Sequence, residues 1–109
     1  MVGNAPGDTA VTDAEGYLVD PSEWTEAFAE KVARTEGIAL TDEHWRVIRF
    51  IRRWLEEHGV TPDARHVMKF LAGDREAGRA RMFELFPYGY VKQACKIAGM
   101  KKPRAWSTG

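Results

Sequence analysis

Apolar positions along the chain follow a helical period, and the segments that carry them end at glycines. The first segment starts at Asp20-Pro21, where Asp20 can cap a helix and Pro21 suits its first position, and it ends at Gly37. The second lies between a capping Thr41 and Gly59, and apolar residues cover most of its circumference. The pattern therefore predicts two long helices, of which the second is central to the core.

Three further helices are predicted in the second half of the chain. The third opens with Thr-Pro-Asp at residues 61–63 and stops near Gly73. Residues 74–78 are polar and predict a connector to a short helix over residues 79–86. The last helix is predicted over residues 87–99, because it begins with a proline and closes with a glycine.

Two short β-prone runs precede the helices, at residues 10–12 and 17–19. The four residues between them end in glycine, which predicts a small hairpin. A hairpin of this size is marginal alone and must pack on the helices. The expected fold is therefore mainly α, a bundle of about five helices with a small N-terminal β-hairpin.

Length and composition favour one domain and exclude several kinds of protein. The chain has 109 residues, of which 44% are hydrophobic. We expect residues 1–8 to be disordered, residues 9–99 to form the domain and residues 100–109 to be a flexible C-terminal arm. The N-terminus resembles no secretory signal and no run is long enough for a membrane helix, so we expect a cytoplasmic protein.

Metal, cofactor and self-contained enzyme sites are not expected. The single cysteine excludes an internal disulfide and a cysteine-based metal cluster. The three histidines lack ligand spacing, and the chain has neither a glycine-rich phosphate loop nor a nucleophile elbow.

The charge is balanced overall but divided along the chain. Residues 1–40 hold eight acids and two bases, whereas residues 41–109 hold eight acids and fourteen bases. No acid follows Glu84. Either the two halves attract each other, or a basic C-terminal surface meets an acidic partner or nucleic acid.

Two stretches are distinctive enough to indicate a family. The first is DAEGYL at residues 13–18 with Trp24, EGIALT at residues 36–41 and His44-Trp45. The second is LFPYG at residues 85–89, KQACKIAG at residues 92–99 and Lys102-Pro103. Over about residues 12–104 the chain resembles the DsrC/TusE family, which includes the dissimilatory sulfite reductase gamma subunit and the sulfur-relay protein of tRNA thiolation.

The resemblance implies an orthogonal helical bundle and a role in sulfur relay. Family members carry sulfur as a persulfide on a cysteine near the end of a mobile C-terminal arm, which reaches into a partner's active site. Many have a second cysteine eleven positions earlier, on the last helix. Cys95 matches that helix cysteine, while Trp106 stands where the arm cysteine is expected. The chain is thus identified as a divergent member without the arm thiol, and Tyr90 also replaces a proline common in the family.

Cys95 remains the candidate persulfide or redox thiol, and two readings of it are open. A free cysteine on an amphipathic helix is most often a small core residue. The neighbouring charges of Lys92 and Lys96 favour a lowered thiol pKa, whereas a position near the helix C-terminus disfavours a thiolate.

The expected function is that of an accessory protein that docks on a sulfite-reductase-type enzyme or a sulfurtransferase through its last helix and arm. The expected partner-binding residues are the basic ones after Glu84 and an aromatic anchor: Lys92, Lys96, Lys101, Lys102, Arg104 and Trp106. The alternative is a DNA-binding regulator, because the second and third helices resemble a helix-turn-helix. It would contact DNA through Arg46, Arg49 and Arg53, with Arg65, His66 and Lys69 on the following helix.

Overall fold

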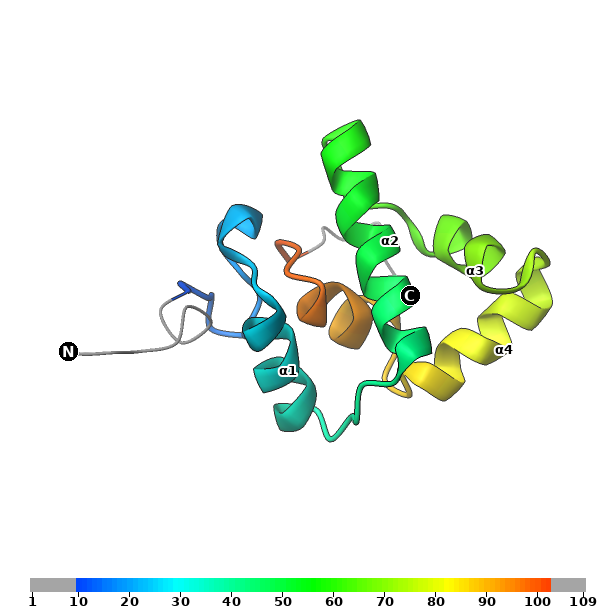
Figure 1. The fold of residues 1–109 in the computed structure, drawn as a ribbon, viewed down its shortest axis with the longest axis horizontal. Helices are drawn as coiled ribbons and strands as arrows, with labels where there is room; N and C mark the ends of the chain where they lie inside the picture. Colours follow the sequence, from blue (N-terminus) through cyan, green and yellow to red (C-terminus); the bar gives the residue numbers. More distant parts are fainter. Residues whose placement is uncertain (1–9, 103–109) are drawn as a thin grey trace.

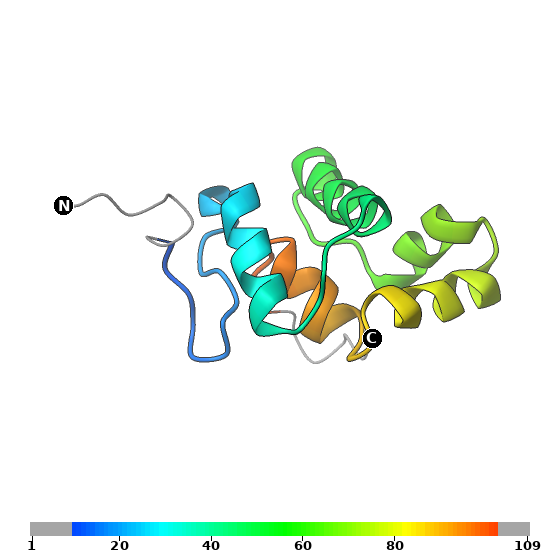
Figure 2. The same cartoon turned by 60° about the horizontal axis from the view of Figure 1, so that its bottom comes forward.

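The structure is a computed structural model, and it describes residues 10–102. Its elements are η2 (Pro21–Glu23), α1 (Glu26–Thr35), α2 (Asp42–His58), α3 (Ala64–Ala72), α4 (Arg75–Leu85) and η3 (Tyr90–Cys95). Helix α2 crosses the middle of the domain, with α1 on one side of it and the α3–α4 pair on the other (Figure 1). The segment that contains η3 lies between α1 and α2 in both views (Figures 1 and 2). The predicted mainly α fold is confirmed, and no helix in the described part of the chain is long and apolar enough to cross a membrane.

Helix α2 begins and ends as its capping residues predict. The Thr41 backbone N–H donates to Nδ1 of His44 at 3.0 Å, and the Thr41 hydroxyl accepts from the His44 backbone N–H, which completes a capping box. Gly59 ends the helix in the left-handed conformation, at φ 76°. The other ring nitrogen of His44 lies 2.8 Å from the Leu85 carbonyl, so this cap also ties α2 to the end of α4.

The first predicted helix starts at Pro21 with Asp20 as its cap, as predicted, but it is divided in two and does not run on unbroken to Gly37. Asp20 caps only a single 3-10 turn, and Trp24 is extended at ψ 141°. Thr25 then caps α1 by accepting a hydrogen bond from the Phe28 backbone N–H at 3.0 Å. The break turns the Trp24 side chain toward the last helix, a long-range contact that local propensity does not encode.

Helix α4 is longer than predicted, and the predicted connector over residues 74–78 is wrong. The carboxylate of Asp74 accepts from the Glu76 backbone N–H at 3.1 Å and caps a helix that starts at Arg75. Gly78 lies inside this helix because α4 packs closely on α3: a Cβ there would lie 2.0 Å from the Met68 carbonyl oxygen.

The last helical segment starts later than predicted, after a turn at Pro87 and Tyr88. Gly89 has φ 102°, and the six residues of η3 form a π-helix, which is an uncommon conformation often found at functional sites. Residues 96 and 97 continue as α-helix, and a turn at residues 98 and 99 follows.

The predicted hairpin is present as a single antiparallel bridge between Thr12 and Leu18. The Val19 backbone N–H donates to the Val11 carbonyl at 3.1 Å beside it. Tyr17 and Leu18 are buried, so the bridge is held by packing on the helices, as its size requires.

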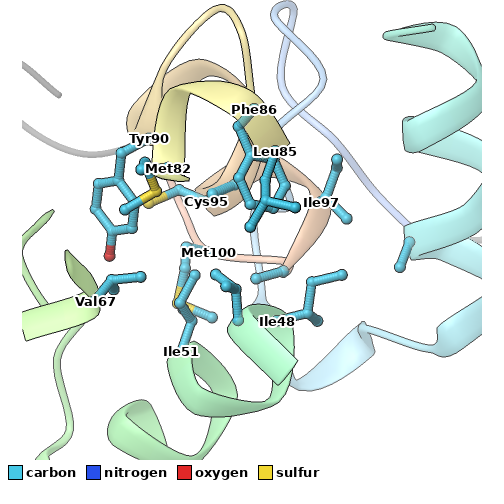
Figure 3. Close-up of a cluster of buried hydrophobic side chains, with 14 of the residues drawn as sticks. Ile48, Ile51, Val67, Met82, Leu85, Phe86, Tyr90, Cys95, Ile97 and Met100 are labelled. Carbon is cyan, nitrogen blue, oxygen red and sulfur yellow. The ribbon is translucent and has the colours of Figure 1, made fainter. Parts of the chain in front are cut away.

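The core is one continuous cluster of apolar side chains from α1, α2, α3, α4 and the last segment. Figure 3 shows Cys95 within it, beside Met82 and Tyr90, with Met100 between the last segment and α2. Met100 is fully buried. Met100, which was predicted to belong to the flexible arm, is part of the core.

Candidate functional site

A surface groove lies where the N-terminal bridge, the end of α1 and the last helical segment meet. Its volume is about 600 Å³. Its walls are charged and aromatic: Glu15, Tyr17, Glu36, Tyr88, Val91, Lys92, Lys96 and Lys102. The groove thus gathers three of the predicted partner-binding lysines at the point where the C-terminal segment leaves the domain.

Two of these lysines are held by carboxylates from the N-terminal half. Nζ of Lys96 lies 3.3 Å from Oε2 of Glu36, and both side chains are less than a fifth exposed, at 17% and 18%. Lys96 also lies 5.2 Å above the centre of the Tyr17 ring. Lys102 pairs with Glu15 at 2.7 Å in a solvent-exposed position. With three lysines and two glutamates, the charged residues of the groove carry an excess of one positive charge.

Gln93 connects the floor of the groove to the turn before η3. It is buried, its amide nitrogen donates to Oε1 of Glu36 at 3.2 Å, and its oxygen accepts from the Tyr88 backbone N–H at 2.9 Å. These bonds hold the turn in which the Tyr88 side chain is 73% exposed. An exposed tyrosine on a fixed backbone is the kind of residue that anchors protein interfaces.

Tyr17 joins the N-terminal bridge to η3. Its hydroxyl donates to the Val91 carbonyl at 3.1 Å. Burial, together with the nearby Cys95 and carboxylates, raises the pKa of Tyr17 to about 12. The hydroxyl therefore stays protonated and keeps its donor role through the physiological range.

Cys95 lies beneath this groove and outside its lining. Its side chain is fully buried, and burial raises the pKa of the thiol to about 12. The expectation that Lys92 and Lys96 lower this pKa is wrong, because both lysines line the groove while the thiol is enclosed by apolar side chains (Figure 3).

The nearby Tyr90 hydroxyl lowers the pKa of this thiol, but the effect of burial is larger. The Tyr90 hydroxyl donates to the Pro62 carbonyl. Tyr90 stands where the resemblance leads us to expect a proline, and here its hydroxyl satisfies the Pro62 carbonyl. A thiol that is neutral and enclosed lacks the thiolate form and the access that a nucleophile needs.

The remaining predicted site residues are separated by the structure. Lys101 is exposed and does not line the groove. Arg104 and Trp106 lie outside the described residues. Arg52, one of the arginines on the polar side of α2, turns onto the end of the last helical segment and donates to the Ala98 carbonyl.

Three of the basic side chains proposed for DNA contact make contacts within the protein. Arg46 stacks over Phe70, with its guanidinium carbon 5.2 Å from the ring centre. Arg49 pairs with Glu26 at 3.2 Å, and Arg65 pairs with Asp63 at 3.1 Å. On the face that was expected to meet DNA phosphates, these three cationic side chains therefore make intramolecular contacts.

Comparison with known proteins gives consistent matches over nearly the whole chain. The family model described as DsrC like protein matches residues 4–105. The protein named sulfurtransferase TusE of Pectobacterium atrosepticum is 45% identical over 100 residues, covering 89% of this chain and 92% of the relative. The TusE of Escherichia coli is 43% identical with the same coverage. None of these relatives is named for DNA binding.

Solved structures share the fold. The oxidized gamma subunit of the dissimilatory sulfite reductase, DsrC, from Archaeoglobus fulgidus superposes with a TM-score of 0.76 at 37% identity, covering 88% of this chain and 90% of that one. A chain in the structure of dissimilatory sulfite reductase I gives a TM-score of 0.74 at 27% identity, covering 88% and 89%. By sequence and by fold, the chain belongs to the DsrC-like protein family.

Proposed function

We propose that this protein is a cytoplasmic docking subunit of sulfur metabolism, which binds a sulfite-reductase-type enzyme or a sulfurtransferase through the groove and the C-terminal arm. The observation that carries the proposal is the convergence of Lys92, Lys96 and Lys102 with the exposed Tyr88 on one groove. An exposed aromatic side chain is typical of the centre of a protein interface, and charged side chains such as these lysines are typical of its polar rim.

The names of the relatives support the class of partner. One matching structure is described as the gamma subunit of a dissimilatory sulfite reductase, and another matching chain belongs to a structure of such an enzyme. The sequence relatives are named as sulfurtransferases. The excess positive charge of the groove favours a partner surface that is acidic where it meets Lys92.

The position of Cys95 supports docking over turnover of sulfur. The single thiol of the chain is enclosed in the core, and Trp106 stands at the position of the arm cysteine. We therefore propose that the folded protein binds its partner without carrying a persulfide on Cys95, as a regulatory or accessory subunit.

Binding to two purified probes tests the proposal. The first is the Archaeoglobus fulgidus dissimilatory sulfite reductase with its gamma subunit removed, and the second is a persulfide-forming sulfurtransferase from the same organism as this chain. Biolayer interferometry measures the dissociation constants of each probe for three forms of the protein. These are the full-length protein, the Lys92→Glu variant and a chain that ends at Lys102. Lys69→Glu is the matched control, because Lys69 is an exposed lysine on α3 and does not line the groove.

Lys92→Glu is expected to weaken binding of at least one probe by about fivefold to tenfold, since reversal of a charge at an interface costs about 1 kcal/mol or more. Lys69→Glu is expected to leave the affinity within about twofold. Equal effects of the two reversals would exclude the groove as the docking surface. If the protein binds neither of the two probes, the proposed function itself is overturned.

A further inference from the structure

The three lysines of the groove differ in how each charge is neutralised. Lys96 and Glu36 form a pair in which neither side chain is more than a fifth exposed. The pair of Lys102 with Glu15 is exposed to solvent, at 55% and 54%. Within the described part of the chain, Lys92 pairs with no carboxylate. The groove therefore has one enclosed cation, one cation in a weak exposed pair and one open cation.

Lys96 is fixed by its surroundings and is not available to a partner. A Cβ on Gly16 would lie 3.7 Å from Cδ of Lys96, so the N-terminal turn lies against the lysine side chain. The ammonium group contacts the Tyr17 ring and the Glu36 carboxylate. Removal of that carboxylate would leave a largely buried ammonium without its counter-charge, so this pair does not exchange its anion.

The turn that carries Glu15 is rigid, whereas the Glu15 carboxylate itself remains in solvent. The carboxylate of Asp13 accepts from the backbone N–H groups of Glu15 at 2.9 Å and Tyr17 at 3.0 Å, as in an Asx turn. The Tyr17 hydroxyl fixes the same turn to the Val91 carbonyl. The backbone thus presents the Glu15 carboxylate to Lys102 at a place that a second molecule reaches from solvent.

We propose that Glu15 is an internal competitor of the groove: its carboxylate neutralises Lys102 in the free protein, and a carboxylate of an acidic partner segment replaces it there while the same segment binds Lys92. Glu15 and Glu36 illustrate that carboxylates fit the lysines of this groove. An excess of one positive charge is small for nucleic acid, which needs several cations along its phosphates. The inference deepens the proposed function and rests on it only for the identity of the partner.

A hexaglutamate peptide tests the competition without a sulfur enzyme. The isotope-labelled full-length protein is titrated with the peptide at low salt, where exposed charges are little screened. NMR follows the side-chain Cε–Hε signals of Lys92 and Lys102 and gives the dissociation constant. The parent is compared with Glu15→Gln and with the matched control Glu30→Gln, which removes the same charge from an exposed position on α1 outside the groove.

The parent is expected to show saturable shifts of both lysine signals. Glu15→Gln is expected to bind the peptide about threefold more tightly, because no internal pair must be broken, and Glu30→Gln is expected to stay within about 1.5-fold of the parent. Equal affinities of the parent and Glu15→Gln, or the absence of saturable shifts at the two lysines, would overturn the proposal. Tighter binding of a hexathymidylate than of the peptide would also overturn it, since the occupant would then be a nucleic acid.

Lys102→Met separates competition from simple repulsion between Glu15 and an acidic ligand. Competition predicts that the gain from Glu15→Gln shrinks by at least about twofold in the Lys102→Met chain, because that chain has no pair to break. Equal gains with and without Lys102 would show repulsion alone and reject the proposal.

The pair is also measurable in the free protein. Its hydrogen bond to Glu15 raises the pKa of Lys102. Titration of the same NMR signals against pH is expected to give a lower pKa of Lys102 in Glu15→Gln than in the parent. An unchanged pKa would show that the pair does not form in solution and would reject the competition.

The two enzyme probes distinguish failure of this inference from failure of the proposed function. Glu15→Gln is expected to tighten binding of the probe that docks by about threefold. If neither enzyme binds while the peptide behaves as expected, the proposed function fails and the competition at Lys102 stands. If an enzyme binds and Glu15→Gln tightens neither that enzyme nor the peptide, the competition fails and docking stands.

Discussion

The side chains of Tyr90 and Cys95 lie side by side inside the core (Figure 3). Both residues are almost completely buried, at 1% and 0% exposure. Burial leaves the only sulfhydryl of the chain neutral and enclosed, so chemistry at this sulfur requires the domain to open.

Cys95 is expected to resist sulfur transfer while the protein is folded. Incubation with polysulfide at pH 8 should add a sulfur atom to Cys95 at least about 100-fold more slowly in buffer than in guanidinium chloride, because the folded domain exposes the thiol only on opening. Intact-mass spectrometry measures the adduct, and peptide mapping locates it. Lys92→Cys supplies an exposed thiol on the groove as the positive control. Equal native rates at positions 92 and 95 would restore Cys95 as a carrier.

The free energy of unfolding is expected to fall as the pH rises from about 9 to about 12. Burial raises the pKa of Cys95 from 9.0 to about 12 and that of Tyr17 from 10.0 to about 12. Both groups are neutral acids in the folded state, so the unfolded chain loses its protons first and is favoured at alkaline pH. The stability they supply is complete below pH 9 and is lost as the pH passes about 12.

Urea unfolding at a series of alkaline pH values measures this slope. Cys95→Ala is expected to fold, and its free energy of unfolding is expected to fall less steeply between pH 9 and 12, because one of the two titrating groups is removed. An unchanged slope in Cys95→Ala would contradict the assignment of the thiol as a titrating buried group.

Gly78→Ala is expected to destabilise the domain by about 2 kcal/mol or more, although alanine is the better helix former. The new Cβ would overlap the backbone of Met68 and force α4 away from α3. Gly37→Ala is the comparison, since Gly37 has φ 75° with open space around its Cβ position and is expected to cost only about 1 kcal/mol. Thermal and urea unfolding give both values, and a neutral or stabilising Gly78→Ala would show that the helix pair is looser than described.

Glu36→Gln is expected to cost about 1 to 2 kcal/mol, because it removes one charge of a partly buried pair and leaves the Lys96 ammonium without its carboxylate. The exposed pair of Glu26 with Arg49 provides the matched change, Glu26→Gln, which is expected to cost less than about 0.5 kcal/mol. Chemical denaturation of both variants at low salt compares them. Similar costs would mean that the Glu36–Lys96 pair is as well solvated as a surface pair.

The candidate site was only half predictable from the sequence. The basic character of the C-terminal region and its lysines are apparent from composition, and Lys92 and Lys96 lie four residues apart on one helix. Their partners are not: Glu36 is 60 positions before Lys96, and Glu15 meets Lys102 only in the folded domain. Nothing in the local pattern distinguishes these two carboxylates from the other six acids of the first forty residues.

Local chemistry by itself determined the frame of this protein. Thr41 and Gly59 delimit α2, and Gly73 ends α3, because a side-chain cap and a left-handed glycine each act on their own helix. The family motifs likewise indicated the bundle and its class before any contact was known.

Only the tertiary structure decided which side chains are available for chemistry. It enclosed Cys95, turned Arg52 from the polar side of α2 onto the Ala98 carbonyl, and kept Gly78 within a helix. Burial and close approach depend on segments tens of residues apart, and these contacts override the propensities and charges of neighbours along the chain.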